Sequence, residues 1–318
     1  MKKGDNLVSQ IRAEVKKVVI GQELIINSVI RAILADGHIL IEGVPGLAKT
    51  VLIRAFSKVI GCDFKRVQFT VDLLPSDVIG LNSFDPATKS YKIVEGPVFT
   101  NLLLADEINR ASPKVQSALL EAMAEKQVTI GTESRKLSLP FFVFATQNPL
   151  ENLGTYPLPQ AQLDRFLFKI IMRYPSIEEE TQILDMRMGD ARFEKVNTLL
   201  TPEKIIKVQN DVHKVYISEE VKRYIVHIIN ATRYPSEYKL KYADFIEVGC
   251  GPRATLALVG AARAEAFINE RDYVTPQDVK EISYDVLRHR LGVNYLGQAK
   301  NVTTDKIIQE ILLTVPVP

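Results

Sequence analysis

The residues with the clearest capacity for chemistry lie between His38 and Thr50, which read His-Ile-Leu-Ile-Glu-Gly-Val-Pro-Gly-Leu-Ala-Lys-Thr. A short apolar run is followed by Gly43 and Gly46, and then by Lys49 and Thr50 at the start of an apolar helical pattern. A strand, a glycine turn and a helix N-terminus in this order direct backbone N–H groups at phosphates. Lys49 has the length to reach the β- and γ-phosphates, and the Thr50 hydroxyl is a suitable Mg²⁺ ligand. The sequence therefore predicts a nucleoside triphosphate site.

Ala48 departs from the G-x-x-x-x-G-K-[ST] phosphate-loop pattern, because it occupies the position of the second glycine. We expect this alanine to be tolerated, since a right-handed backbone at the start of a helix accommodates a methyl group. The alternative is a simple strand-to-helix turn with a solvated lysine, because short glycine motifs recur by chance. The predicted cofactor-binding stretch is Gly43, Val44, Pro45, Gly46, Leu47, Ala48, Lys49, Thr50 and Val51.

Two adjacent carboxylates end a second apolar run, residues 101–107, which read Asn-Leu-Leu-Leu-Ala-Asp-Glu. At the carboxyl end of a buried parallel strand they would emerge beside the phosphate loop, where ligands of open α/β sheets bind. Asp106 is then predicted to hold Mg²⁺ through water, and Glu107 to polarise the attacking water. The alternative is a solvated acidic turn, but the pairing with the glycine stretch favours a nucleotide site.

Two further side chains are candidate partners of the phosphates. Asn148 follows the apolar run 140–146, where its amide can orient water or bind the γ-phosphate, although an Asn before Pro is also a common turn residue. Arg165 precedes the apolar run 166–172. An arginine there either neutralises charge in the transition state of phosphoryl transfer or forms a surface pair with Asp164.

Arg253 is a candidate from the second half of the chain. It follows Gly251-Pro252 at the start of a helical pattern, so we expect it at a helix N-terminus that faces the phosphates across a cleft. The alternative is a plain surface arginine. Other chemistries find less support, because the four histidines have no metal-binding spacing and the chain has no glycine-flanked serine for a catalytic triad.

The composition fits a globular protein of about two domains. The 318 residues are 46% hydrophobic and 25% charged, with a formal net charge of +2. This balance does not favour a nucleic-acid groove, and no apolar run reaches the ~18 residues of a membrane span. Cys62 and Cys250 form no metal or disulfide pattern, which fits a reducing compartment. The first residues lack the apolar core of a signal peptide, so we expect a cytoplasmic protein.

Short apolar runs alternate with helical patterns up to about residue 170, which is typical of a parallel sheet covered by helices. Helices are predicted from Lys49 to a stop at Gly61 and after Ser112-Pro113. The predicted strands are 38–42, 65–70, 101–106, 140–146 and 166–172. We expect the inserts 83–98 and 127–139 to form β-hairpins that project from the core, although the sequence alone slightly favours excursions without a role.

After about residue 173 the strand-like runs stop and helix starts recur. Thr201-Pro202, Ser218 and Thr275-Pro276 are such starts, and Asp278 is placed to complete a capping box with Thr275. We therefore expect two domains, an αβα core over residues 1–200 and an all-helical domain over residues 201–318.

These motifs together resemble those of the AAA+ ATPases, and most closely those of the MoxR family. The resemblance covers nearly the whole chain and extends to Ala48, which is itself like MoxR proteins. The residues that carry it are Val19-Ile20-Gly21-Gln22, Gly43–Thr50, Ala105-Asp106-Glu107-Ile108-Asn109-Arg110, Thr146-Gln147-Asn148-Pro149, Gln162-Leu163-Asp164-Arg165-Phe166 and Gly251-Pro252-Arg253.

The resemblance implies a fold and a role for each candidate residue. The implied fold is α/β: a P-loop αβα core with a parallel five-stranded sheet in the order 5-1-4-3-2, followed by an all-helical lid. Ile20 and Gly21 would lie near the adenine, and Asn148 would be sensor 1. Arg165 would be the finger inserted into a neighbour's site, and Arg253 would be sensor 2. The two hairpins would face the centre of a ring.

The activity that the resemblance implies is Mg²⁺-dependent hydrolysis of ATP by a hexameric ring that remodels a client protein. Relatives often act with a von Willebrand factor A-type partner in maturation or metal-cofactor insertion. In the expected chemistry Glu107 is the base, Thr50 and Asp106 hold Mg²⁺, and Lys49 and Arg165 stabilise charge.

Two functions of other classes remain open at this point. A DNA-translocating motor needs basic residues on the ring-facing hairpins, where the sequence supplies Lys89, Lys92, Arg135 and Lys136. A nucleotide-dependent scaffold that does not hydrolyse ATP is disfavoured by the presence of both carboxylates and of the amide of Asn148.

Overall fold

The computed structural model describes residues 3–86, 89–149, 154–188 and 196–318. Its centre is a parallel sheet of five strands, β1 (Ile39–Glu42), β2 (Phe64–Gln68), β5 (Leu102–Asp106), β8 (Phe142–Gln147) and β9 (Phe168–Ile171). The strands lie in the order β2-β5-β8-β1-β9. Read from β9 and numbered by their sequence among these five, this is the order 5-1-4-3-2, so the expected topology is confirmed.

Alternation of side chains explains why helices cover both faces of this sheet. Leu102 and Leu104 of β5 pack in one buried cluster with α1 (Lys3–Lys16), α2 (Glu23–Leu34) and α3 (Lys49–Val59). Leu103 and Ala105 pack in a second cluster with α4 (Pro75–Ile79) and α5 (Pro113–Glu125). Successive residues of a strand point to opposite faces, and a strand buried on both sides reads as a continuous apolar run.

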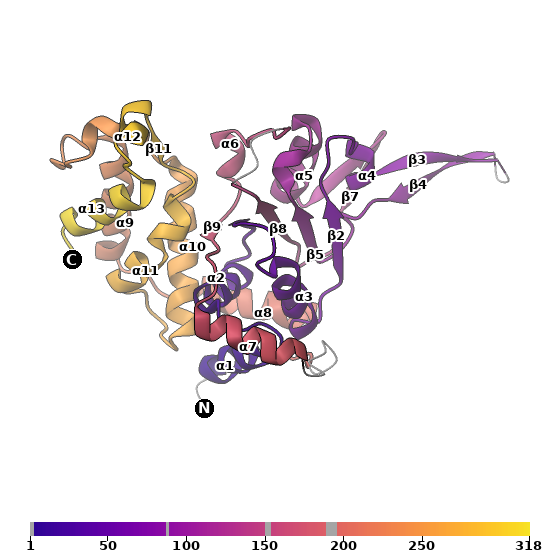
Figure 1. Ribbon diagram of the computed structural model, residues 1–318, viewed down its shortest axis with the longest axis horizontal. Helices are drawn as coiled ribbons and strands as arrows, with labels where there is room; N and C mark the ends of the chain where they lie inside the picture. Colours follow the sequence, from indigo (N-terminus) through magenta and orange to yellow (C-terminus); the bar gives the residue numbers. More distant parts are fainter. Residues whose placement is uncertain (1–2, 87–88, 150–153, 189–195) are drawn as a thin grey trace.

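Both predicted inserts are antiparallel hairpins. In the first, β3 (Gly80–Asp85) pairs with β4 (Ser90–Glu95), and in the second, β6 (Gln127–Ile130) pairs with β7 (Glu133–Lys136). The first hairpin extends far from the sheet (Figure 1). It starts three residues before the predicted bound, because Gly80 already pairs with Glu95. Residues 87 and 88 of the expected turn lie outside the described residues.

Helices dominate the rest of the chain, as expected. A short α6 (Gln160–Leu163) precedes β9, and α7 (Ile177–Met188) follows it. The remaining helices are α8 (Pro202–His213), α9 (Glu219–Arg233), α10 (Pro252–Ile268), α11 (Pro276–Leu287), α12 (Tyr295–Ala299) and α13 (Thr304–Thr314). The predicted starts at Thr201, Ser218 and Thr275 are N-caps whose hydroxyls accept backbone N–H groups, and Asp278 completes the capping box at Thr275.

The helical lid is not purely helical. β10 (Ile246–Val248) and β11 (Gly292–Val293) form a small antiparallel pair within it. Strands of three and two residues are too short to leave an alternating pattern in a sequence. The helical character of the lid is therefore confirmed, and this pair is an addition that the sequence did not predict.

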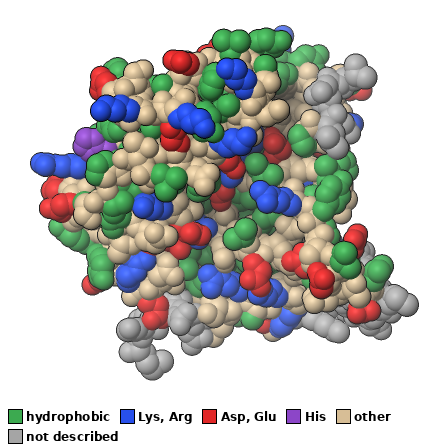
Figure 2. Space-filling view, turned by 60° about the vertical axis from the view of Figure 1, so that its left-hand side comes forward, with side chains coloured by type: hydrophobic (Ala, Val, Ile, Leu, Met, Phe, Trp, Pro, Cys, Tyr) green, Lys and Arg blue, Asp and Glu red, His purple; other side chains and the backbone are tan. Residues whose placement is uncertain are grey.

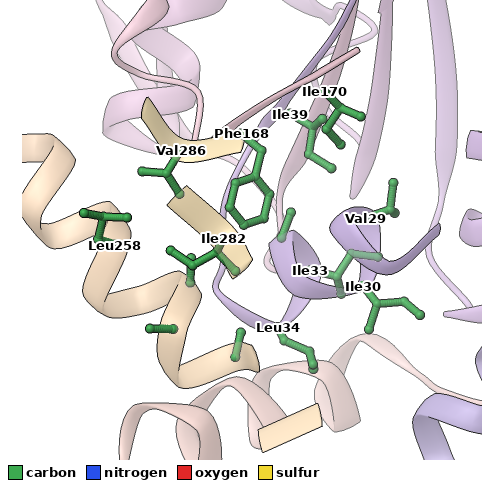
Figure 3. Close-up of a cluster of buried hydrophobic side chains, with 14 of the residues drawn as sticks. Val29, Ile30, Ile33, Leu34, Ile39, Phe168, Ile170, Leu258, Ile282 and Val286 are labelled. Atoms are coloured by element: carbon green, nitrogen blue, oxygen red, sulfur yellow. The ribbon is translucent and has the colours of Figure 1, made fainter. Parts of the chain in front are cut away.

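The lid packs on the sheet-bearing part through one continuous buried cluster. Phe168 of β9 lies between Ile33 of α2 and the pair Ile282 and Val286 of α11, and Ile170 of the same strand lies beside Ile39 (Figure 3). Leu258 of α10 belongs to the same cluster. The boundary near residue 200 remains a prediction, since this buried cluster is continuous on both sides of it.

Both cysteines are buried and free. None of the helices in the described ranges is long and apolar enough to span a membrane.

Candidate functional site

The phosphate loop connects the carboxyl end of β1 to the start of α3. The N–H of Gly43 donates to the Gln147 carbonyl at the end of β8, with 3.2 Å between N and O. Gly43 also lies against Met172, because a Cβ at this position would come within 2.9 Å of the Met172 Cβ. Gly46 has a φ of +85°, a conformation that favours glycine. Val44, Pro45 and Leu47 complete the turn, so the loop is anchored at β8 and its tip is exposed.

Ala48 is not in the right-handed backbone that we expected. Its φ and ψ are 58° and 28°, so the residue before α3 is in the left-handed region. This expectation was wrong because a residue that caps a helix is not itself helical, and here the chain turns left-handed before Lys49. For an L-residue this conformation costs roughly 1–2 kcal/mol. The position is therefore one that glycine fits better, as in the strict phosphate-loop pattern.

Lys49, Thr50 and Val51 form the first turn of α3. The Lys49 ammonium donates to the Gly43 carbonyl and so lies folded over the loop. Burial lowers the pKa of Lys49, whereas the nearby carboxylates of Asp106, Glu107 and Glu42 act to raise it. The lysine of the loop and both predicted acids therefore lie within electrostatic reach of one another, at the carboxyl edge of the sheet.

Asp106 ends β5 and is held on both carboxylate oxygens. The Thr146 hydroxyl of β8 donates to Oδ1 at 2.6 Å, and the Arg66 guanidinium of β2 donates to Oδ2 at 2.6 Å. Thr146 also accepts the backbone N–H of Glu107 at 2.9 Å, so one hydroxyl orients both acids. The neighbouring strands on each side of β5 thus fix its carboxyl end.

Glu107 lies directly after β5 with a φ of 57°. Its Oε2 accepts a hydrogen bond from Gln68 Nε2 at 2.8 Å and lies 3.1 Å from Arg110 Nε. The Glu107 side chain remains 25% exposed, so water reaches it. A carboxylate that is ordered by an amide and a guanidinium and is still accessible has the position that a base acting on water needs.

The donor set at this edge fits Mg²⁺. The Thr50 hydroxyl and the Asp106 carboxylate supply hard oxygens, and Mg²⁺ usually binds few protein oxygens and keeps several waters. Among the described residues, no cluster of three or more His, Cys, Asp or Glu forms a dedicated metal site. Asn148 is buried immediately after β8, next in the chain to the Gln147 carbonyl that anchors the loop.

Arg165 and Arg253 lie elsewhere. Phe168 of β9 pairs with Ile39 and Ile171 pairs with Glu42, so residues before 168 lie at the amino edge of the sheet, opposite the phosphate loop. Arg165 occupies this edge, where its Nη1 donates to the Leu120 carbonyl of α5. Its Nε is buried without a hydrogen-bond partner in the described part of the chain.

Arg253 begins α10 and reaches the same edge. Its Nη1 lies 3.8 Å from Asp164 Oδ2, and its side chain is 59% exposed. Asp164 therefore pairs with Arg253 and with Arg290, whose Nε donates to Oδ1 at 2.7 Å. The structure brings Arg165 and Arg253 to one edge and does not bring Arg253 to the phosphate loop of its own chain. The reason is that the lid packs beside β9 (Figure 1).

The segment expected near adenine precedes α2. Gly21 has a φ of +66°, and a Cβ on it would come within 2.3 Å of the Glu179 carboxylate of α7. The side-chain Nε2 of the next residue, Gln22, donates to the Arg173 carbonyl at 3.1 Å. Gly21 and Gln22 thus lie against the chain that follows β9, and Ile20 and Gly21 are both half-buried. Their contact with adenine remains a prediction.

Sequence reasoning missed three polar residues of the site, Arg66, Gln68 and Thr146, as partners of the two acids. One signal was available. Arg66 and Gln68 are two residues apart in a strand, so their side chains share a face, and the register pairs Gln68 with Asp106. Polar residues at the ends of strands that neighbour an acidic strand are candidates for such contacts.

Comparisons with known proteins agree with this arrangement. Residues 38–168 match the model of the "ATPase family associated with various cellular activities (AAA)", and residues 242–311 match the AAA lid domain. The uncharacterized protein YeaC of Bacillus subtilis is 42% identical over 313 residues, which cover 98% of this chain and 95% of that protein. The chaperone MoxR1 of Mycobacterium tuberculosis is 42% identical over 306 residues, covering 96% and 81%.

A more distant relative and a solved structure extend the similarity. The protein MoxR of Methylorubrum extorquens is 30% identical over 332 residues, covering 98% of this chain and 95% of that protein. A crystal structure of a candidate ATPase from Cytophaga hutchinsonii superposes with a TM-score of 0.93 at 44% identity, covering 99% of this chain and 96% of that one. With the phosphate loop, the paired acids and the 5-1-4-3-2 sheet in place, the chain belongs to the MoxR family of AAA+ ATPases.

Proposed function

We propose that this chain binds ATP with Mg²⁺ and hydrolyses it at the carboxyl edge of its sheet. The proposal rests on the convergence of the phosphate loop and both acids at the end of β8. Gly43 of the loop donates to the Gln147 carbonyl, and the preceding residue, Thr146, holds Asp106 and Glu107. A loop that presents N–H groups, a lysine and two carboxylates is a set of groups suited to phosphoryl transfer to water.

Each residue has a defined task in this proposal. The loop from Gly43 to Val51 holds the phosphates, and Lys49 exchanges its bond to the Gly43 carbonyl for phosphate oxygens. Thr50 and Asp106 hold Mg²⁺, which when bound neutralises charge on the phosphate oxygens. Glu107 takes the proton of the attacking water, and Asn148 orients that water from the end of β8. Ile20 and Gly21 contact the adenine.

We propose that the site is completed by a second subunit. Arg165 and Arg253 lie at the amino edge, opposite their own phosphate loop, and both carry a guanidinium that can neutralise phosphate charge. In a closed head-to-tail ring this edge can meet the carboxyl edge of the next subunit. Arg165, with Arg253 beside it, then stabilises the transition state in its neighbour, and Glu107 acts in its own subunit.

The cellular role that fits best is remodelling of a client protein by a ring, with six subunits as the expected number. The two projecting hairpins are the proposed client-contacting elements, and a von Willebrand factor A-type protein is the proposed partner. The relative named chaperone MoxR1 supports this direction. The DNA-motor alternative loses support at the second hairpin, because Arg135 is engaged by Glu95 and Glu133. On the lid side, basic and acidic side chains are interspersed (Figure 2).

Phosphate release by the wild type and by Glu107→Gln tests the proposed activity. The amide cannot accept the proton, so we expect turnover to fall by about 10²–10⁴-fold while binding of ATP·Mg²⁺ is retained. Glu121→Gln on the exposed face of α5 is the matched control, and it should keep wild-type turnover. Turnover of Glu107→Gln within a few-fold of the wild type would remove Glu107 from the role of base.

A wild type that binds ATP and releases no phosphate in any assembly state would favour the scaffold instead. Stimulation of phosphate release by DNA would favour the motor. Sedimentation of Glu107→Gln with ATP·Mg²⁺ tests the ring, because a variant that binds without turnover keeps the nucleotide-bound assembly. We expect a hexamer there, and a monomer under these conditions would contradict the shared site.

A further inference from the structure

Three consecutive lid residues, Arg288, His289 and Arg290, directly follow α11. Arg288 donates to the Lys169 carbonyl of β9, whereas His289 and Arg290 contact the residues just before that strand. The last two of them hold the chain that carries Arg165. The contact joins residues more than 120 positions apart in the sequence. It is distinct from the phosphate loop and its acids, and no step of the proposed chemistry uses it.

Arg290 is the centre of this contact. Its side chain is only 3% exposed. Nη2 donates to the Asp164 carbonyl at 3.2 Å and to the Phe166 carbonyl at 2.5 Å, so one nitrogen spans the residues on both sides of Arg165. Nη1 donates to the Leu167 carbonyl at 3.0 Å, and Nε donates to the Asp164 carboxylate.

Two further hydrogen bonds strengthen the same contact. His289 Nε2 lies 2.9 Å from the Phe166 carbonyl and donates to it. Gln160 of α6 donates through Nε2 to the His289 carbonyl at 2.8 Å. From the sheet side, the Leu167 N–H donates to the His38 carbonyl at 2.8 Å. The backbone from 164 to 167 is therefore fixed by the lid and by β1 together.

We propose that Arg290, with His289, positions Arg165, so that the lid sets where the finger of each subunit meets its neighbour's nucleotide. This proposal rests on the shared site described above. The fork of a guanidinium donates to several acceptors in a fixed plane, which a lysine ammonium cannot reproduce. Backbone carbonyls that lose a buried donor are costly to leave unpaired, so the segment has one favoured arrangement while Arg290 is present.

The same contact links the two arginines of the amino edge. Asp164 accepts from Arg290 on Oδ1 and pairs with Arg253 on Oδ2. Arg290 therefore holds the backbone of Arg165 and the carboxylate partner of Arg253 at once. Because α11 packs on Phe168 within a continuous buried cluster, a displacement of the lid moves this contact and the finger together (Figure 3).

Arg290→Lys tests the proposal, and Arg31→Lys is its matched control. Arg31 is also buried and also bridges the sheet-bearing part to the lid, from α2 to Glu265 and Glu281, but it does not touch residues 164–167. A finger displaced by about 1 Å costs about 10²-fold in rate, so we expect kcat of Arg290→Lys to fall about 10- to 100-fold with KM for ATP unchanged. Arg31→Lys should lose stability with kcat within about three-fold of the wild type.

Equal losses of kcat in the two variants would overturn the proposal, because general loosening of the lid would then explain both. If Arg290→Lys does not fold, the exposed Gln160→Ala decides instead. We expect this variant to fold and to lose kcat a few-fold, since it removes one hydrogen bond of the contact. An unchanged kcat in Gln160→Ala would then overturn the proposal.

Mixed assemblies separate positioning of the finger from damage to the subunit's own site. An Arg290→Lys subunit keeps its own Glu107, so mixing it with Glu107→Gln subunits should raise activity above that of the separate variants. Mixing it with Arg165→Ala subunits should give no gain, because neither supplies a working finger. The reverse pattern would place the defect in the subunit's own nucleotide site and overturn the proposal. Failure of Arg165→Ala and Glu107→Gln to complement each other would instead refute the shared site itself.

Discussion

The two edges of the sheet are built in different ways. At the carboxyl edge, side chains hold one another: Asp106 and Glu107 are tied to Arg66, Gln68 and Thr146, and Arg66 is about half exposed. At the amino edge, the backbone from 164 to 167 is held by a buried arginine that arrives from the lid.

The difference reflects what each edge has to do. Hydrogen bonds from exposed side chains such as Arg66 and Gln68 are worth little and exchange readily with water or a ligand. A buried guanidinium that donates to several carbonyls cannot move away without leaving those carbonyls buried and without hydrogen-bond partners. The carboxyl edge is thus suited to exchange its internal contacts for phosphates and Mg²⁺, and the amino edge is suited to keep one fixed position.

Lys49→Ala should abolish measurable ATP binding. The ammonium folds over an exposed loop and is the one side-chain cation that the loop itself supplies. A charge-assisted hydrogen bond to phosphate is worth about 1.5–3 kcal/mol, so we expect binding to weaken by up to about 100-fold with the fold intact, beyond what calorimetry detects for a weak ligand. Calorimetry with ATP measures it. Lys58→Ala, in the last turn of the same helix, should bind as the wild type does, and equal affinities for all three proteins would remove the loop from the site.

Acid should weaken the amino edge. His38 is buried there, with Nδ1 accepting from the Val143 N–H and Nε2 bonded to the Met123 carbonyl. Burial lowers its pKa from 6.5 to about 4, so the fold favours neutral His38 and the protonated form favours unfolding. Stability from this group is complete above pH 6.5 and is lost as the pH falls toward 4.

Urea unfolding at pH 7.5 and pH 5 measures this loss. From the two pKa values we expect His38 to contribute about 2 kcal/mol to the decrease in the free energy of unfolding. His38→Asn, which can still accept the Val143 N–H, should lack this contribution. Burial also lowers the pKa of His289, and that residue is present in both proteins, so their difference reports His38. Parallel pH profiles would contradict the assignment.

Gln68→Ala should have a modest effect on turnover. Gln68 orders Glu107 by one neutral hydrogen bond, and Arg110 still lies beside the same oxygen after the change. A bond of this kind is worth about 0.5–1.5 kcal/mol, so we expect kcat to change by less than about ten-fold. Phosphate release measures it, with Lys65→Ala on the same strand as the control. A loss as large as that of Glu107→Gln would show that the carboxyl edge is not exchangeable in the way described.

Ala48→Gly should have the smallest effect, a gain in stability. The change relieves a left-handed alanine, at roughly 1–2 kcal/mol. The added glycine also costs about 0.5–1 kcal/mol through the entropy of the unfolded chain, so the net gain is between about 0 and 1.5 kcal/mol. Ala55→Gly, in the middle of α3, should instead lose stability. Urea unfolding of both variants checks this, and a loss at Ala48→Gly similar to that at Ala55→Gly would contradict the left-handed assignment.

The carboxyl edge could be predicted from the sequence because its signals are local. An apolar run followed by a glycine turn or by Asp106-Glu107 places each group at the end of a strand, and parallel strands bring those ends together. The left-handed backbone of Ala48 could not be predicted in this way, since the residue that caps a helix does not adopt the φ and ψ of the helix itself.

The amino edge is different, because Arg290 and Asp164 are 126 positions apart. Nothing in the neighbourhood of either residue indicates its partner. The predicted position of Arg253 was wrong for the same reason. Its helix start can be predicted from the sequence, but the packing of the lid beside β9 depends on the whole core. The pair β10 and β11 is shorter than any pattern that alternation can reveal.

Mixing of Arg165→Ala and Glu107→Gln subunits tests directly whether each active site is formed by the carboxyl edge of one subunit and the amino edge of its neighbour. Both variants should be nearly inactive as pure assemblies, and subunit exchange is first established by fluorescence transfer between labelled variants. Phosphate release should then rise above that of either variant alone, because some interfaces pair an intact Glu107 with an intact Arg165 from the next subunit. If exchange is complete and phosphate release stays at the level of the separate variants, Arg165 does not act in a neighbour's site and the active sites are not shared.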